Sequence, residues 1–599
     1  MKNTNLHSIY KNLLSDHKLE LKKSKRSARV ISIIRLIVFV VGVILIYLFS
    51  NAGLAGYLTF TIVLAVVVFL VLVKIHSKVL YKQKIQKAFI KINEDELTAL
   101  SGDFSHFENG KGFVDSKHPY SFDIDIFSEG SLFQFLNRTS TFIGKIKLVD
   151  RLRFPFLEKE KIVAYQQAIS ELIRMLDWRQ KFQTIGISHK EKESDKERIL
   201  QWIGRPTLFQ NPLFFLLVII VPLLSLTMVV LFSIDLINEK QLLFYFLVPL
   251  GISGSYSVKI NRKHNEVSRT SAMLGKYGKL LNEIESNDFE SSVLTGFKES
   301  LKENDSSAAS EIKKLSKILG ALDSRLNIVA WFFLNGVFLW DILQMVRLER
   351  WQLKHQNKLE SWFDIIAETE VLISLANFAY NNPEATFPEI GNGDYVLKAK
   401  SLGHPLILKE ARVDNSAEIS SKGFTIITGA NMAGKSTWLR TIGVNLILGM
   451  VGAPVCGLGV KIKPIQLYTS IRTDDSLQKN ESYFYSELKR LKVIIDELKK
   501  GTKLFIILDE ILRGTNSKDK HAGSEALLKQ LIELDTTGII ATHDVSLGIL
   551  EKSFPQHIKN RCFEVDINGN ELSFDYKLRD GVSKNMNATI LMREMGITV

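Results

Sequence analysis

The segment from Phe424 to Thr437 reads Phe-Thr-Ile-Ile-Thr-Gly-Ala-Asn-Met-Ala-Gly-Lys-Ser-Thr and contains the pattern Gly-x-x-x-x-Gly-Lys-Ser. A short β-branched run precedes the glycines, and Trp438 to Ile442 follows with the pattern of a helix start. Glycines placed between a strand and a helix let backbone N–H groups surround phosphate oxygens at a helix N-terminus, where the partial charge is positive. The segment therefore predicts a strand, a phosphate-binding loop and a helix. A glycine-rich turn that matches by chance is the alternative, and it leaves the flanking strand and helix unexplained.

Each part of this loop has a predicted task toward ATP and Mg²⁺. Gly429 and Gly434 allow the backbone to approach the phosphates closely. Lys435 is expected to reach the β- and γ-phosphates, and the Ser436 hydroxyl is expected to hold Mg²⁺.

Two later strands are predicted to complete a site for hydrolysis. The apolar run Lys503 to Leu508 ends in Asp509-Glu510, and the run Gly538 to Ala541 ends in Thr542-His543. The carboxyl ends of neighbouring parallel strands meet at one edge of a sheet, so Asp509 is predicted in the Mg²⁺ shell and Glu510 beside the attacking water. His543 is predicted to sense or orient the γ-phosphate. A histidine at a strand end is more often structural, and only its place after the other two motifs favours this role.

Two long apolar segments near the start predict a membrane hairpin. Ile33 to Ser50 and Leu54 to Val73 are each close to the ~20 residues that cross a bilayer as a helix. The turn between them has no Lys or Arg, whereas both outer flanks are rich in Lys, so both ends are expected in the cytoplasm. A buried helical hairpin of a soluble protein is the alternative.

A second hairpin is predicted from Leu213 to Ile234 and from Leu242 to Val258, with Lys and Arg beyond it. The expected topology again places the soluble parts, including the phosphate loop, in the cytoplasm. The chain is thus expected in the cell inner (cytoplasmic) membrane as a multi-pass protein. A third apolar stretch, Ile328 to Leu339, is too short to span and runs into charged residues, so it is predicted to be a buried helix of a soluble helical region.

The formal charge of +13 is not evidence for nucleic-acid binding. Residues 1–35 contribute +7 and residues 74–90 contribute +5, which leaves about +1 for the rest of the chain. The basic excess therefore belongs to the flanks of the first hairpin. The two cysteines, Cys456 and Cys562, are too few for a disulfide framework or a zinc site and favour a reducing compartment.

The motifs of the C-terminal part resemble the ATPase domain of the MutS family, which is associated with DNA mismatch repair. The resemblance rests on Thr428 to Thr437, Leu508-Asp-Glu-Ile511, Arg513-Gly-Thr515 and Ala541-Thr-His543. It adds Asn431, Met432 and Thr437 to the expected nucleotide-binding residues. Upstream, the segments Leu136 to Gly144 and Gly403-His-Pro405 with Asn415 resemble the family's helical core and the approach to its ATPase domain.

The resemblance implies a homodimer with two composite ATP sites, because Ser482-Tyr-Phe484 with Glu487 resembles the segment that contacts the partner's nucleotide. Ser482 is therefore expected to act across the interface. DNA binding is implied by the resemblance alone. The chain departs from the family in several ways. A membrane hairpin and a linker stand where the family has a mismatch-reading domain, and the second hairpin stands where the family's helical levers extend toward the DNA clamp. Ser470 takes a place where the family usually has Arg, and Arg412 takes the place of an adenine-stacking aromatic residue. The tripeptides Phe127-Ser-Glu129 and Phe156-Leu-Glu158 match the family's Phe-x-Glu wedge only by chance.

The predicted fold is an α/β phosphate-loop ATPase domain of the MutS or ABC-like type, preceded by an all-α core and lever region that carries two transmembrane hairpins. The predicted boundaries are 1–75 for a basic segment and the first hairpin (spans about 33–50 and 54–73), 76–120 for a linker, 121–210 for the start of the helical core, 211–260 for the second hairpin (spans about 213–234 and 242–258), 261–400 for the core and lever continuation, and 401–599 for the ATPase domain.

Three functions remain open from the sequence. The first is a membrane-anchored ATPase that couples ATP to the binding of mismatched or structured DNA, and it predicts a basic surface on the helical arms. The second is an ATP-driven membrane switch of the same ancestry without nucleic acid. The third is an ABC-type transporter, which is disfavoured because no Leu-Ser-Gly-Gly-Gln segment precedes Asp509 and the membrane helices carry few polar groups for a substrate path.

Overall fold

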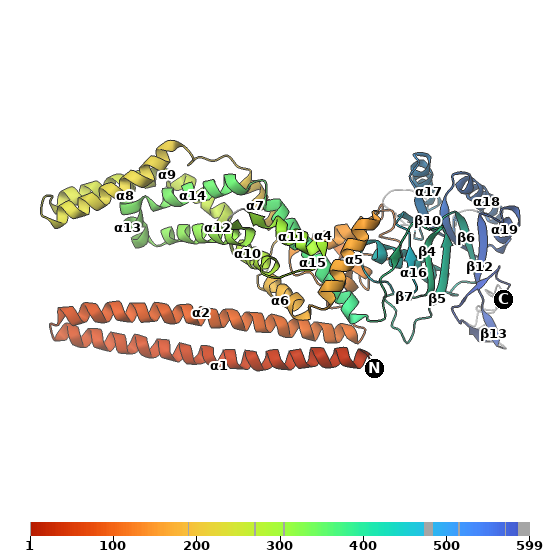
Figure 1. Cartoon of the computed structure of the whole chain (residues 1–599), viewed down its shortest axis with the longest axis horizontal. Coiled ribbons are helices and arrows are strands. Elements are labelled where there is room, and N and C mark those ends of the chain that lie inside the picture. Colours follow the sequence, from red (N-terminus) through yellow and green to blue (C-terminus); the bar gives the residue numbers. More distant parts are fainter. Residues whose placement is uncertain are drawn as a thin grey trace.

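The computed structural model describes residues 2–189, 191–268, 271–303, 306–472, 483–512, 516–568 and 571–584. The molecule is elongated, with two helical arms at one end and an α/β region at the other (Figure 1). The C-terminal region is α/β, as the motifs predicted, and it contains mixed sheets.

The first arm is a long hairpin of α1 (Lys2–Asn51) and α2 (Ala55–Leu100), which lie side by side (Figure 1). Helix α2 continues to Leu100, so residues 76–100 are helical where the sequence predicted a linker. At the inner end, the buried Glu96 carboxylate pairs with Arg138 at 2.6 Å and accepts a hydrogen bond from Asn377 at 2.8 Å. These contacts fix the inner end of the hairpin to the helical body.

The second arm ends in a hairpin of α8 (Pro212–Ser233) and α9 (Glu239–Ser268). Within the described residues, α1, α2, α8 and α9 are long and apolar enough to cross a membrane, judged by length and composition only. The apolar side chains of these helices are largely exposed in the chain by itself. The apolar tips of both hairpins lie at the same end of the molecule, away from the sheets (Figure 1).

The third apolar stretch does not form the buried helix that the sequence predicted. It is helix α13 (Ile328–Phe338), and only Asn335 and Gly336 of its residues are buried. One face packs on α8 and α9, and the other exposes large apolar side chains. The prediction was wrong because an apolar run that is too short to cross a bilayer can also lie outside a soluble core.

The helical body between the arms and the sheets is built from amphipathic helices around α15, whose residues are almost all buried. Residues 162–182 fall into two helices, which are divided at Arg174-Met175. Phe127 lies buried in the core, in agreement with a chance match to the wedge tripeptide. The helices are α3 (Leu132–Leu136), α4 (Phe142–Arg153), α5 (Lys159–Ile173), α6 (Leu176–Ile187), α7 (Ser194–Ile203), α10 (Ser271–Glu285), α11 (Ser292–Ser300), α12 (Ala308–Asp323), α14 (Trp340–His355) and α15 (Leu359–Asn381).

The main sheet has the strand order β15-β12-β6-β11-β10-β9. All neighbours are parallel except β15, which pairs antiparallel with β12. The strands are β6 (Gly423–Gly429), β9 (Gln466–Ser470), β10 (Leu504–Asp509), β11 (Thr537–Thr542), β12 (Ile558–Phe563) and β15 (Leu578–Asp580).

The strands of this sheet are apolar throughout because both faces are covered. Ile427, Ile507 and Ile539 pack with α16 (Lys435–Met450) and the helical body. The alternate residues Ile426 and Ile506 pack instead with α17 (Tyr483–Lys499) and α18 (Ser517–Glu533).

A second, smaller sheet leads into the main one and has the order β3-β8-β4-β5, with β7 paired to β4. The loop between β4 and β5 covers residues 403–414 and reaches the functional site described below. The strands are β3 (Glu389–Ile390), β4 (Tyr395–Leu402), β5 (Asn415–Ser420), β7 (Gly457–Leu458) and β8 (Lys461–Ile462).

Candidate nucleotide-binding site

The predicted phosphate loop connects the end of β6 with the start of α16, which confirms the predicted strand and helix on either side of it. Gly434 has a φ of 102°, a left-handed conformation that glycine adopts without strain. The buried Lys435 donates from Nζ to the carbonyl oxygens of Gly429 at 2.7 Å and Ala430 at 2.9 Å. The lysine ammonium is thus held over the loop, where a phosphate would lie.

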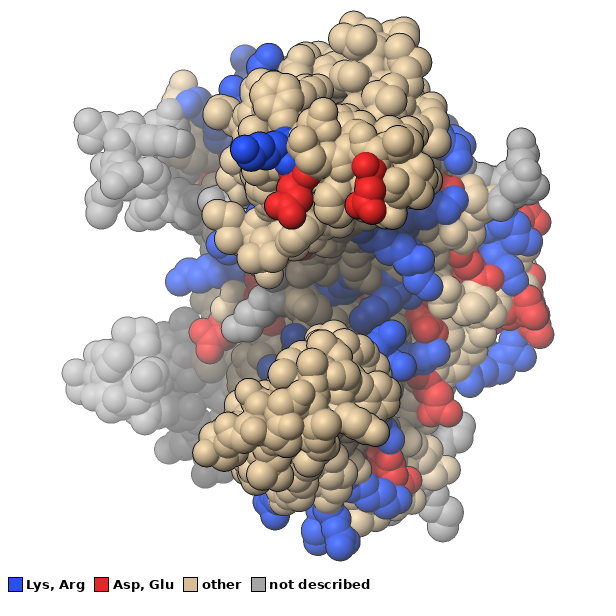
Figure 2. All heavy atoms as spheres, turned by 90° about the vertical axis from the view of Figure 1, so that its left-hand side faces the viewer, with Lys and Arg blue, Asp and Glu red and all other residues tan. Residues whose placement is uncertain are grey.

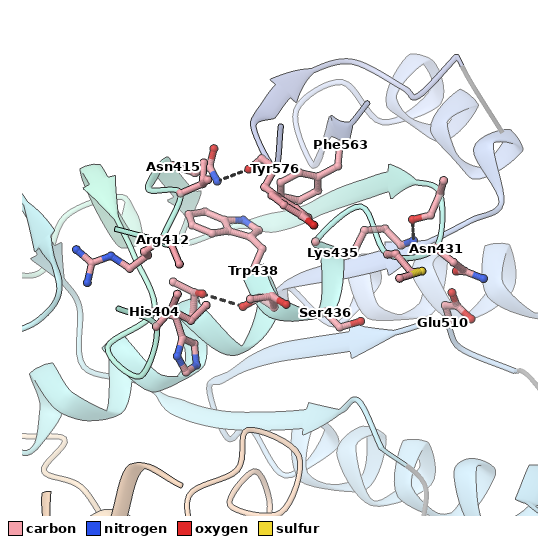
Figure 3. A pocket seen from close by; sticks show the side chains of 18 residues that line it. His404, Arg412, Asn415, Asn431, Lys435, Ser436, Trp438, Glu510, Phe563 and Tyr576 are labelled. Carbon is pink, nitrogen blue, oxygen red and sulfur yellow. Dashed lines mark hydrogen bonds between the residues drawn. The ribbon is translucent and has the colours of Figure 1, made fainter. Parts of the chain in front are cut away.

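A pocket of about 530 Å³ opens beside this loop (Figure 3). Its phosphate side is formed by the loop and by the first turn of α16, so backbone N–H groups that have no carbonyl partner within the helix lie at its wall. The opposite side carries aromatic residues and part of the 403–414 loop. The predicted binding residues that line the pocket are Asn431, Met432, Gly434, Lys435, Ser436 and Thr437.

Two oxygen-bearing side chains meet where Mg²⁺ was predicted. The Ser436 hydroxyl donates to the Asp509 carboxylate at 2.5 Å, so the start of α16 and the end of β10 bring both groups together. Mg²⁺ prefers oxygen ligands and is commonly bound through one or two protein groups together with phosphates and water. The pair therefore fits a magnesium ion shared with a nucleotide.

Glu510 follows directly and lines the same pocket. Its backbone has a φ of 51°, and its N–H donates to the carbonyl oxygen of Ala541 at 2.8 Å, so the residue is fixed to the neighbouring strand. His543 lies at the end of that strand, with Nδ1 3.5 Å from a Glu510 carboxylate oxygen. Lys520 Nζ lies 3.4 Å from the other ring nitrogen of His543. The structure thus brings Glu510 and His543 together at the phosphate side.

Glu487 of α17 holds the backbone beyond Glu510. The buried Glu487 carboxylate accepts a hydrogen bond from the N–H of Leu512 at 2.6 Å, and Leu512 also has a positive φ, of 62°. Two left-handed residues in such a short segment need outside support, and Glu487 supplies it. Ser482, which the sequence predicted to act across a dimer interface, lies outside the described residues, as does Arg513-Gly-Thr515.

The aromatic side of the pocket was not predicted from the sequence. Trp438, Phe563 and Tyr576 line it and offer ring faces to a base (Figure 3). Asn415 fixes the chain at Tyr576, because its amide donates to the Tyr576 carbonyl at 2.9 Å and accepts from the N–H of Leu578 at 2.9 Å. These residues come from three segments that are distant in the sequence, and no local sequence pattern connects them.

Arg412 lines the pocket, but it does not replace a stacking ring. Its Nε donates to Asp414 at 2.7 Å, and its side chain points away from Trp438 (Figure 3). His404 lies nearby, where burial and then the charges of Arg440 and Arg412 lower its pKa to about 4. Its Nδ1 accepts a hydrogen bond from the N–H of Leu406, so the neutral ring carries its proton on Nε2. His404 is therefore an uncharged donor at this side of the pocket.

Two parts of the chain match family models. Residues 116–376 match MutS domain III, and residues 425–595 match MutS domain V. The first match runs through the second hairpin, and the second contains all the pocket residues from the phosphate loop onward.

Individual relatives are similar over the C-terminal part. A "DNA mismatch repair protein MutS" of Thermotoga neapolitana is 31% identical over 239 residues, which is 38% of this chain and 28% of that protein. "MutS protein homolog 4" of Homo sapiens is 29% identical over 246 residues, or 39% of this chain and 25% of that protein. The matched stretch thus spans less than a third of these relatives' own lengths. Together with the two family models, these similarities show that the chain belongs to the MutS family.

Proposed function

We propose that this chain is a membrane-attached ATPase that binds and hydrolyses Mg-ATP in a homodimer with composite sites. The observation that carries the proposal is the convergence in one pocket of Lys435, the Ser436–Asp509 pair and Glu510, delivered by α16 and β10. A P-loop that only bound nucleotide would not need a carboxylate next to the metal-binding pair.

Each residue of the site has its own role in the proposed hydrolysis. Lys435 exchanges its carbonyl partners for the β- and γ-phosphates, and the N-terminus of α16 favours their negative charge. Ser436 and Asp509 would hold Mg²⁺, which would supply positive charge against the charge that develops on the phosphates. Glu510 accepts a hydrogen bond from the attacking water, and His543 holds the Glu510 side chain in position. The ring faces of Trp438 and Tyr576 take the base.

The dimer is proposed from the composite-site expectation for Ser482 and from the position of α17. Helix α17 follows directly on the segment of Ser482, and it also holds the backbone beyond Glu510 through Glu487. A partner that contacts α17 would therefore act on the hydrolytic carboxylate of this chain. This arrangement supports a site that becomes active on assembly.

Membrane attachment is proposed from the four apolar helices. Their tips lie at one end of the molecule, so one bilayer can receive both hairpins. Lysines lie on the soluble side of the first hairpin, and by the positive-inside rule this supports a cytoplasmic ATPase domain. The proposed location is the inner membrane.

DNA is the proposed ligand of the arms. Relatives named as mismatch repair proteins support it. A hollow of about 790 Å³ between α2, α6, α10 and α12 also supports it, because Lys279 and Lys313 line it in addition to Lys181, which pairs with Glu283 at 2.8 Å. Figure 2, which views the molecule from the hairpin tips, shows Lys and Arg side chains between the two apolar projections. Such a surface attracts phosphates through charge.

A membrane switch without nucleic acid is the second candidate, and the 403–414 loop favours it. One side of this loop lines the nucleotide pocket through His404 and Arg412. Its other side faces the end of α2, where Leu408 packs beside Gly102. The 403–414 loop therefore contacts both the nucleotide pocket and the first hairpin, so nucleotide binding can act on the hairpin through this loop.

The test is ATP turnover by the detergent-solubilised chain, with homoduplex, mismatched or branched DNA, across a salt series. The Lys435→Ala variant is the control for contaminating ATPases. Stimulation by DNA that weakens with salt supports the DNA function, and the preferred DNA names the target. Turnover that is indifferent to all three DNAs supports the membrane switch. Absence of any turnover above the Lys435→Ala variant would overturn the proposal.

A further inference from the structure

Helix α13 presents an apolar surface that no residue in the described part of the chain covers. Its eleven residues, Ile-Val-Ala-Trp-Phe-Phe-Leu-Asn-Gly-Val-Phe, carry no charge. Ile328 is 80% exposed, Val329 61% and Phe333 63%. Three large apolar residues exposed this strongly on one short helix cost free energy in water, at about 25 cal/mol per Å².

The opposite face of α13 is fixed to the second hairpin by close packing and polar contacts. A Cβ added to Gly336 would lie 3.2 Å from the Phe246 ring, so glycine allows α13 to approach α9. The buried Asn335 accepts from Ser253 of α9 at 3.1 Å, and Ser225 of α8 donates to the Val337 carbonyl at 3.0 Å. α13 is therefore an integral part of the hairpin module and not a loose segment.

The chain also turns sharply after α13. Leu339 has a φ of 47°, and α13 meets α14 at 78°. The turn is held by Asn335, which accepts from the N–H of Asp341, and by Asp341, which pairs with Arg325 at 3.3 Å. α13 thus lies across the direction of α12 and α14, at the end of the arm that carries the hairpin tips (Figure 1).

We propose that α13 is a third membrane element, which embeds in the bilayer leaflet that faces the soluble domains and presents Val329, Phe332 and Phe333 to acyl chains. This inference rests on the proposed membrane attachment. An eleven-residue helix is only about 16 Å long, so it cannot cross a hydrocarbon core of about 30 Å. It can lie within one leaflet.

Lipid is favoured over a protein partner because the exposed face of α13 is continuous with the membrane hairpin. α13 packs directly on α8 and α9, whose own outer residues, such as Leu223 and Leu247, are exposed and apolar. Cationic residues follow toward the soluble arm, with Lys259 and Arg262 in α9 and Arg347 in α14, and the buried Asp341 directly after α13 is paired with Arg325. An apolar helix that is followed by cationic residues is typical of a segment at the membrane interface.

Spin-label depth measurements test the inference in the full chain. The buried native cysteines are replaced by alanine, and single cysteines are introduced by Phe333→Cys in α13, Val66→Cys in α2 and Leu353→Cys in α14. Val66 lies in the first hairpin, and Leu353 is an exposed residue of the soluble arm. The chain is reconstituted in vesicles of phosphatidylglycerol and phosphatidylcholine, and each label is exposed to oxygen, which enters lipid, or to a water-soluble nickel chelate. Elution volume on gel filtration checks folding.

We expect the ratio of oxygen to nickel accessibility at position 333 to be several-fold higher than at 353 and lower than at 66. If the accessibility ratio at position 333 equals that at 353 while the ratio at 66 is typical of lipid, the inference is overturned and the proposed membrane attachment is not. A label at 333 that neither reagent reaches would overturn it as well, because α13 would then be covered by protein. Water-like values at all three positions would overturn both proposals.

Discussion

The Glu510→Gln substitution is the sharpest test of the site because it changes charge with almost no change in shape. Glu510 lines the pocket next to the Ser436–Asp509 pair, and its left-handed backbone costs the same whether Glu or Gln occupies the position. A positioned base contributes roughly 10²- to 10⁴-fold to a rate. Loss of the carboxylate should therefore slow hydrolysis by that factor, which corresponds to about 3 to 5 kcal/mol of barrier.

The same substitution should affect folding only slightly. The contact of Glu510 with His543 is long, at 3.5 Å, and the histidine is half exposed, so the pair contributes about 1 kcal/mol at most. Nucleotide binding should persist, because Lys435 and the loop are unchanged. The expected result is an ATP-bound dimer that accumulates because it cannot turn over.

The assay combines single-turnover hydrolysis of radiolabelled ATP, binding of a fluorescent ATP analogue and light scattering for dimer mass. The matched control is Glu389→Gln, which removes another ion-paired glutamate, 2.7 Å from Lys461 in the small sheet and outside the pocket. Hydrolysis by Glu510→Gln at the rate of the control would refute the assigned role. Loss of nucleotide binding in Glu510→Gln would show that the residue stabilises the phosphate loop and does not act by positioning the attacking water.

Three further changes have defined outcomes. Lys435→Ala should abolish nucleotide binding or turnover, measured with the same analogue, because the loop loses the cation that faces the phosphates; normal turnover would contradict this. Gly144→Ala should lower the melting temperature, because the new Cβ would lie 2.9 Å from the Glu370 Cβ, whereas Gly320→Ala has open space and should be neutral or stabilising by about 1 kcal/mol. Burial raises the pKa of Glu370 to about 7, so stability from this group is present at low pH and is lost as pH rises from about 4.5 to 7. Glu370→Gln should make the melting temperature nearly independent of pH over that range. An unchanged decrease of the melting temperature with pH would exclude Glu370 as its cause.

The sequence predicted the phosphate side of the site well because that chemistry is local. Glycines, a lysine and a serine at fixed spacing specify a loop between a strand and a helix, and a carboxylate pair at a strand end specifies its partner. The structure places Lys435, Ser436, Asp509 and Glu510 together as these patterns required. Their roles in catalysis remain predictions.

The base side could not be predicted, since it is assembled from residues that no local pattern connects. Trp438 follows the loop, Phe563 ends β12, and Tyr576 is fixed by Asn415, which lies 161 residues earlier. The exposure of helix α13 was predicted wrongly for a different reason. Length and hydropathy show whether a segment can span a bilayer, but the burial of Asn335 and the exposure of Phe333 depend on the tertiary contacts of α8 and α9.

The two anchors limit how ATP can move this molecule if both hairpins cross the bilayer. The first hairpin is fixed near the ATPase end through Glu96 and the 403–414 loop, while the second, with α13, terminates the arm of α12 and α14. Residues 74–100 of α2 form about 40 Å of helix outside the apolar span, so the sheets lie far from the lipid and can affect it only through the helices. Vertical displacement of either hairpin would expose apolar side chains to water, whereas lateral displacement exposes none. An ATP-driven movement of the arm relative to the ATPase domain must therefore change the distance between the two hairpins within the plane of the membrane.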